Sequence, residues 1–270
     1  MRRFYPIQPP VLQRRFSESS PYQYREYMPG NGLESYVACY WTLHTCAANG
    51  NALHRIIPDG CVDIIMDLQA TSTSKGAFVV GIMTNYETMT LSAPTSMFGI
   101  RFYSDKVSRL LRYPVSELTG NPVPLTDLWG RKGEIWVDEV HSSEGISEII
   151  EQVESILQTW LLNLDDSSHS LLPTFMQYIY AHRGSTTVQA LADQFCYSER
   201  TVRRIFQEGL GISPKEMLDI IRFQYLLREW YGGNRIPFSE MALSYGYYDQ
   251  PHFIRQFKRF YGMTPGEVLV

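Results

Sequence analysis

The sequence predicts an α+β protein in two parts, a β-rich N-terminal domain that ends in helices and an all-helical C-terminal domain. Three features of the 270 residues support this expectation. Short runs rich in β-branched and aromatic residues fill positions 32–103, helical periodicity begins at Ser104, and one helical pattern occurs twice in the last hundred residues. We expect the first domain to span residues 1–165 and the second to span residues 171–270, with the polar run 165–170 as a linker.

The first strand signal is the run 33–46, in which Val37, Cys39 and Trp41 alternate with more polar neighbours. This alternation is typical of a β-strand.

The tripeptide Pro58-Asp59-Gly60 predicts a turn, because proline presets φ and glycine accepts a positive φ. Runs 52–57 and 61–68 flank the turn, which predicts a β-hairpin. Further strands are expected at residues 78–83, 87–93 and 97–103, and helices at 104–113, 114–120 and 146–164. Short strands of this kind predict a small barrel or a cupin-like sandwich, closed by helices at its C-terminal end.

The C-terminal domain contains an internal repeat at an offset of 51 positions, in which residues 198–214 align with residues 249–265. Ser198 and Asp249 predict N-caps, because their side-chain oxygens can accept a bond from an amide in the first helical turn. Apolar residues recur at helical spacing after each cap, and the opposite face of each predicted helix, including Gln256 in the second copy, is basic or polar.

A shorter amphipathic segment precedes each cap, with Ala192 in the first copy and Ala242 in the second. Helix, tight turn and second helix form the helix-turn-helix arrangement, whose second helix lies in the DNA major groove. Arginine suits such a helix because its planar fork can bond guanine, and glutamine can bond adenine in the same way. The alternative, that these arginines only solvate a surface helix, is disfavoured because the pattern occurs twice at one offset.

The C-terminal domain resembles the DNA-binding domain of AraC/XylS-type transcription regulators. The first unit carries Ser198-x-Arg200-x-Val202-x-Arg204-x-Phe206 and Gly211-x-Ser213-Pro214. The second carries Gly246-Tyr247, Gln250-x-His252-Phe253-x-Arg255-x-Phe257-Lys258 and Gly262-x-Thr264-Pro265. The resemblance implies two helix-turn-helix units joined by a long helix, with double-stranded DNA as the partner and RNA polymerase as a second partner if the protein is an activator.

The predicted DNA-binding residues are Arg200, Thr201, Arg203, Arg204, Gln250, His252, Arg255 and Lys258. Arg259 is expected to join Lys258 in contacting phosphates. The sequence departs from the family at Cys196, where the turn usually has glycine, so a left-handed backbone there would be strained.

The N-terminal segments 54–68 and 98–130 are similar to an uncharacterised domain found in front of this DNA-binding module in many bacterial regulators. The resemblance implies a sensing or dimerising role for this domain. Two hypotheses follow: the domain binds a small-molecule effector that controls DNA binding, or it only forms a homodimer or docks a protein partner.

An effector pocket is predicted at Tyr40, Trp41, His54 and Arg101, which come from different strands of the expected barrel. The alternative is that Tyr40 and Trp41 only fill a core. His44, His54, Asp59 and Asp63 lie on neighbouring segments but lack a close His-x-His pair, so no metal is expected. No nucleophile, acid-base pair or phosphate loop is recognisable, and we therefore expect neither an enzyme nor a cofactor.

The charges are shared unevenly along the chain. Residues 171–270 hold eleven Lys and Arg against nine Asp and Glu, which leaves 13 basic and 19 acidic residues for the first 170 positions. A net-acidic N-terminal domain is not expected to bind DNA. Four cysteines without a CxxC pair and no apolar run of membrane-spanning length predict a cytoplasmic protein.

Overall fold

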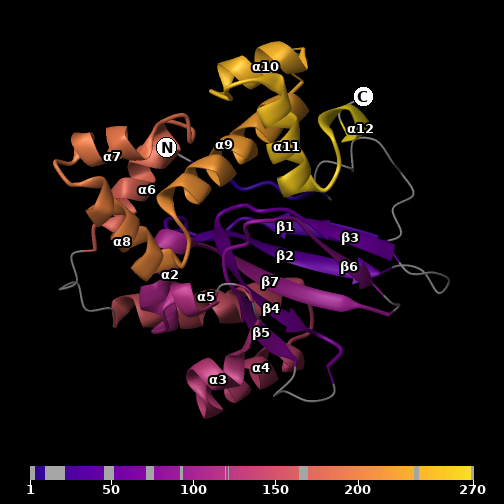
Figure 1. Ribbon diagram of the computed structural model, residues 1–270. Helices are drawn as coiled ribbons and strands as arrows, with labels where there is room; N and C mark the ends of the chain where they lie inside the picture. Colours follow the sequence, from indigo (N-terminus) through magenta and orange to yellow (C-terminus); the bar gives the residue numbers. More distant parts are fainter. Residues whose placement is uncertain are drawn as a thin grey trace.

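The computed structural model describes residues 4–9, 22–45, 52–70, 76–91, 94–118, 120, 122–163, 170–233 and 237–268. The N-terminal half is built on antiparallel strands and the C-terminal half is helical (Figure 1), as the sequence predicts. Helices that follow the strands in the chain lie on one side of the main sheet, and the last helices lie on the other side.

In the part of the chain that the structure describes, the strands form two antiparallel sheets. The larger sheet has the order β1-β2-β7-β4-β5-β8 and the smaller one pairs β3 with β6. The strands are β1 (Tyr22–Tyr27), β2 (Val37–Thr45), β3 (Ala52–Ile56), β4 (Cys61–Asp67), β5 (Ala77–Val80), β6 (Glu87–Leu91), β7 (Ser96–Tyr103) and β8 (Val123–Pro124).

The predicted hairpin around Pro58-Asp59-Gly60 is wrong, because β3 pairs with β6 whereas β4 pairs with β5 and β7. The turn carries the chain from one sheet to the other. Side chains occupy the bonds that a hairpin would use: the Gln8 amide bonds both the N–H and the carbonyl of Ile57, and the Asp59 carboxylate accepts from the Cys61 N–H at 3.0 Å.

Strand β2 forms where the sequence predicts a strand, and it is buried on both faces from Val37 to Leu43. Tyr40 packs into the main core, whereas Cys39, Trp41 and Leu43 form a second cluster on the opposite face. The second cluster lies between the two sheets, and the sequence alone does not predict this position.

Among its described residues, the N-terminal half contains the helices α2 (Ser104–Leu111), α3 (Leu125–Trp129), α4 (Arg131–Ser142) and α5 (Ile146–Leu162) and the 3-10 turn η1 (Val115–Leu118). The C-terminal half contains α6 (Leu172–Ala181), α7 (Val188–Gln194), α8 (Glu199–Leu210), α9 (Pro214–Tyr231), α10 (Phe238–Ser244), α11 (Gln250–Tyr261) and α12 (Pro265–Val268). The sequence did not predict α3 and α4. No helix among the described residues is long and apolar enough to cross a membrane.

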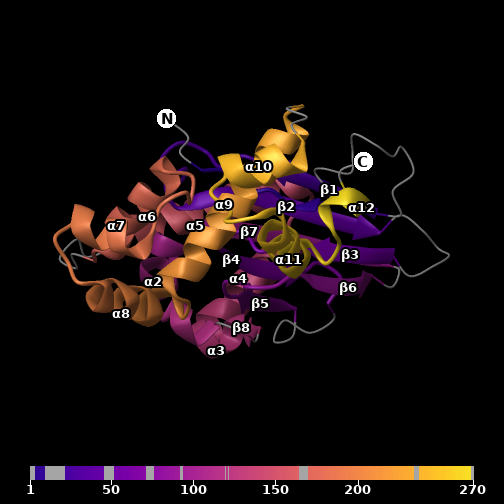
Figure 2. The same cartoon turned by 45° about the horizontal axis from the view of Figure 1, so that its top comes forward.

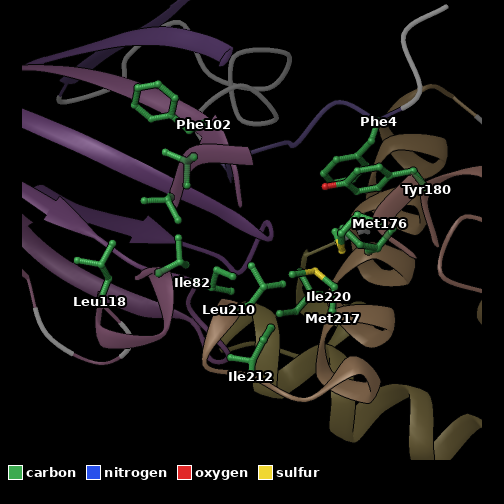
Figure 3. Packing of buried hydrophobic residues seen from close by; sticks show 14 of the residues in the cluster. Phe4, Ile82, Phe102, Leu118, Met176, Tyr180, Leu210, Ile212, Met217 and Ile220 are labelled. Atoms are coloured by element: carbon green, nitrogen blue, oxygen red, sulfur yellow. The ribbon is translucent and has the colours of Figure 1, made fainter. Parts of the chain in front are cut away.

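One apolar core extends through both halves of the chain. Figure 3 shows Leu210 and Ile212 of the C-terminal half beside Ile82 and Leu118 of the N-terminal half. Gly60 also lies against α9, since a Cβ at this position would stand 3.2 Å from the Met217 sulfur. The predicted linker lies outside the described residues, apart from Ser170.

Candidate nucleic-acid interface and ligand cavity

The two repeat copies begin and end their second helices in the same way. The Ser198 hydroxyl accepts from the Thr201 N–H at 3.2 Å at the start of α8, and the Asp249 carboxylate accepts from the His252 N–H at 2.7 Å at the start of α11. Gly211 and Gly262 end the helices in the left-handed conformation, with φ of 72° and 82°. The predicted N-caps are therefore confirmed.

The turns that precede these helices also have matching backbones. Gly246 has a φ of 70° in the second unit, and Cys196 has a φ of 58° in the first. A side chain at such a φ strains the backbone, so the first unit bears a cost that the second avoids.

In the first unit, Arg200, Arg203 and Arg204 all point into solvent. The Arg203 guanidinium lies 2.7 Å from the Glu199 carboxylate, and the Arg204 guanidinium lies 2.9 Å from the Glu208 carboxylate. Exposed pairs one helical turn apart contribute little to stability, so phosphates or bases can replace these acids at low cost. Thr201 is half-buried and its hydroxyl bonds the Ser198 hydroxyl.

In the second unit, Gln250, Arg255 and Lys258 are exposed. His252 is half-buried, with its ring 5.7 Å from the Tyr247 ring. Gln256 was predicted to be exposed and is buried, because it follows Phe253 by three positions and therefore falls on the apolar stripe of α11. Arg200 and Arg255 form no ion pair with any described residue.

Helix α9 connects the two units and separates α8 from α11 (Figure 1). It begins with a capping box, in which the side chains of Ser213 and Glu216 each bond the other residue's backbone. Figure 2 looks along α11, whereas α8 lies across the view, so the two helices are not parallel in this conformation.

The second unit is docked on the N-terminal half through polar groups. The Tyr86 N–H donates to the Arg259 carbonyl at 3.2 Å, and the Arg259 Nε donates to the Asn85 side chain at 3.0 Å. The Arg55 guanidinium donates to the Tyr261 carbonyl and lies 5.5 Å from the centres of the Tyr86 and Tyr261 rings. Arg259, predicted to contact phosphate, is therefore engaged with protein in this conformation.

A cavity of about 550 Å³ lies between the two sheets. Trp41, His54 and Arg101, three of the four residues predicted for an effector pocket, line this cavity. Tyr40 does not line it, because successive residues of a strand point to opposite faces. Its ring stacks on Phe98 with centroids 6.2 Å apart, in the main core.

Arg101 is at the centre of a buried polar cluster at this cavity. Its guanidinium bonds both Asp63 oxygens at 3.1 and 2.9 Å and lies 3.1 Å from Asp59 and 3.7 Å from Glu26. The Trp41 Nε1–H donates to the same Asp63 carboxylate at 3.0 Å. The sequence places Asp59 and Asp63 on neighbouring segments, but nothing in its spacing predicts that they gather around Arg101.

Burial and neighbouring charges shift two pKa values in this cluster. Burial, together with the charge of Asp59, raises the pKa of Asp63 to about 6, although Arg101 opposes the shift. Burial and the charge of Arg101 lower the pKa of His54 to about 4, so this imidazole is neutral at physiological pH. The described residues contain no group of three or more His, Cys, Asp or Glu arranged for a metal ion.

Two family models match the chain. Residues 191–269 match a helix-turn-helix domain, and residues 25–124 match a domain of unknown function (DUF6597). The helix-turn-helix match contains α8, α9 and α11 together, and the other match contains most of the two sheets.

Two curated proteins are similar in sequence. The chain is 27% identical to the HTH-type transcriptional activator RhaS of Escherichia fergusonii over 112 residues. This stretch is 40% of this chain and 39% of that protein. It is 30% identical to an uncharacterized HTH-type transcriptional regulator of Haemophilus influenzae over 83 residues. That stretch is 30% of this chain and 26% of that protein. These matches cover well under half the length of either relative.

Among solved structures, ToxT of Vibrio cholerae is similar at a TM-score of 0.41 and 14% identity, over 93% of this chain and 98% of that one. A structure of ToxT bound to an unsaturated fatty acid gives a TM-score of 0.39 and 13% identity, over 94% and 96% of the two chains. Similarity at this level says nothing about the ligand of the present chain.

Proposed function

We propose that this chain is an AraC-type DNA-binding transcription regulator that binds its operator with both helix-turn-helix units at once. The observation that carries the proposal is the pair of capped helices, α8 and α11, that present exposed arginine faces from the two ends of one connecting helix. In such a complex the two helices enter major-groove segments about one helical turn, roughly 34 Å, apart.

Within this complex, Arg200, Arg203 and Arg204 read base edges from the first unit, and Gln250, His252 and Arg255 read them from the second. Thr201 and Lys258 lie at the edges of these faces and contact the DNA backbone, which fixes the register of the protein. The arginines form the bidentate contacts with guanine that carry most of the sequence preference.

The conformation described above is a DNA-free state in this proposal. Because α8 and α11 are not parallel, the second unit must turn before both helices can reach one duplex. Turning breaks the bonds that Arg259 makes with Asn85 and Tyr86. Arg259 then keeps a partly exposed pair with Glu216 at 3.6 Å, which a phosphate can replace at low cost.

The cavity between the sheets is the effector site in this proposal, with Trp41, His54 and Arg101 among its contacts. The segment 83–88 supports a link to DNA binding, since Asn85 both lines the cavity and holds Arg259. An effector that favours one position of this segment therefore changes the fraction of molecules whose second unit is released. We also propose that the protein forms a homodimer and, if it is an activator, contacts RNA polymerase.

Selection of bound fragments from random duplex DNA tests the DNA-binding proposal most directly. We expect an enriched sequence with two conserved blocks whose centres lie about ten base pairs apart. Enrichment of a single block would restrict base reading to one unit, and recovery of unenriched DNA would overturn sequence-specific binding.

A further inference from the structure

We propose that the cavity between the two sheets binds an organic amine, a ligand with one positive charge and an apolar body. This inference rests on the effector role proposed above and gives that effector a chemical class. Neither the family matches nor the relatives assign a ligand to this cavity.

The charges around the cavity carry the argument. Asp59, Asp63 and Glu87 line it, and Arg101 is the one lysine or arginine among the described residues that do so. Glu26 adds a fourth carboxylate, 3.7 Å from Arg101. A single guanidinium cannot balance four carboxylates, so the cavity has an excess of negative charge that a ligand cation can reduce.

Arg101 is not available to hold an anionic ligand. Its Nε and Nη2 bond Asp63, its Nε also faces Asp59, and its Nη1 lies 3.5 Å from the Tyr24 hydroxyl. Only 3% of the residue is exposed. An anion would have to displace an aspartate from a buried ion pair and leave that aspartate without its partner, which is costly. The neighbouring His54 supplies no positive charge, since burial keeps it neutral.

The walls fit the rest of such a ligand. Trp41 and Tyr24 stack with ring centroids 5.9 Å apart, and aromatic faces attract cations. Gly99 on β7 makes room for the Trp41 ring, because a Cβ at Gly99 would lie only 2.0 Å from that ring. Most of the remaining lining is apolar and includes the three flexible methionines Met83, Met89 and Met97.

The test compares three small probes of similar shape on the full chain: phenethylamine, phenethyl alcohol and phenylacetate. Isothermal titration calorimetry gives the affinity of each. We expect the amine to bind at least about tenfold more tightly than the alcohol, and phenylacetate to bind most weakly. Glu87→Gln removes an exposed lining carboxylate without touching the Arg101 cluster and should weaken the amine severalfold, with no effect on the alcohol.

Asp63→Asn should weaken the amine further, and its folding is checked by circular dichroism because it also alters the Arg101 cluster. Glu151→Gln, an exposed acid on α5 outside the cavity lining, is the matched control and should leave all three affinities unchanged. Binding of all three probes with equal affinity, tighter binding of phenylacetate, or no binding of any probe would overturn the proposed ligand class.

The same samples are then titrated with the selected operator DNA, so that the two proposals can fail separately. Amine binding that changes operator affinity supports both the ligand class and effector control. Amine binding that leaves operator affinity unchanged supports the class and contradicts effector control. A carboxylate or alcohol that binds and changes operator affinity contradicts the class and leaves effector control standing.

Discussion

The two helix-turn-helix units have the same local structure but are attached to the rest of the molecule by different kinds of contact. The first unit ends in Leu210 and Ile212, which are fully buried or nearly so in the core shared with the N-terminal half (Figure 3). The second unit is held to that half by the bonds of Arg259 to Asn85 and Tyr86, just before β6, and by the bond from Arg55 on β3 to the Tyr261 carbonyl.

This difference teaches which unit can move. Separating an apolar contact exposes its whole area to water, at about 25 cal/mol for each Å². Separating exposed hydrogen bonds costs only about 1 kcal/mol each, because water replaces the lost partners. In the function proposed above, the second unit is therefore the one that an effector or DNA reorients, while the first unit stays with the N-terminal half.

The largest expected effect tests the attachment of the second unit. A Cβ at Gly262 would lie 2.5 Å from the Tyr86 ring, and the φ there is 82°. Gly262→Ala should lower the free energy of unfolding by about 2 to 3 kcal/mol, from backbone strain and the lost contact. Urea denaturation measures this change.

Gly246→Ala is the matched control, since Gly246 has a similar φ and nothing within 4 Å of its Cβ position. It should cost about 1 kcal/mol, from strain alone. Equal losses in the two variants would show that the docked contact contributes nothing.

The next effect compares the two recognition helices. Arg255→Ala should cost about 2 kcal/mol of operator binding and Arg204→Ala about 1 kcal/mol, because Arg204 must first leave Glu208. Fluorescence anisotropy with operator duplexes altered at single base pairs measures the loss and the relaxed preference. If both variants bind every duplex as the wild type does, the base-reading role of these arginines is wrong.

A smaller effect concerns the turns. Cys196 has a φ of 58°, a conformation that glycine adopts without strain. Cys196→Gly should raise the free energy of unfolding by about 0.5 to 1 kcal/mol, after the greater flexibility of glycine in the unfolded chain is subtracted. Cys196→Ala, which keeps the strained backbone, should leave thermal stability nearly unchanged, and a gain in both variants would trace the effect to the thiol.

The smallest effect concerns the acids on α8. Glu208→Gln releases Arg204 and removes a negative charge from the DNA-facing side, so operator affinity should rise by about 0.5 kcal/mol. Glu267→Gln removes an acid from the short helix after α11 and serves as a comparison at the second unit. A fall in affinity with Glu208→Gln would mean that the pair positions Arg204 for binding.

The helices of the C-terminal half could be predicted because the signals that set them act within a few residues. The caps Ser198 and Asp249 and the glycines at the helix ends act within a few residues of their own positions, so the sequence is enough to recognise them. The exception is Gln256, whose polarity suggested exposure although its spacing from Phe253 places it on the buried stripe.

The N-terminal half was less predictable because its partners are distant in sequence. The turn at Pro58-Asp59-Gly60 looks like a hairpin, but Gln8, some fifty positions earlier, takes the hydrogen bonds of Ile57. Arg101, Asp63 and Glu26 come from three strands, and no spacing in the chain reveals that they meet.

By itself, then, the sequence determined the two capped recognition helices and the α+β order of the chain, since these depend on interactions between near neighbours. Only the tertiary structure decided which side of β2 faces the cavity, that three carboxylates surround one arginine there, and that the second unit contacts β3 and the segment before β6 through polar groups. Those features require strands and helices far apart in the chain to meet, and sheet pairing and packing choose the partners.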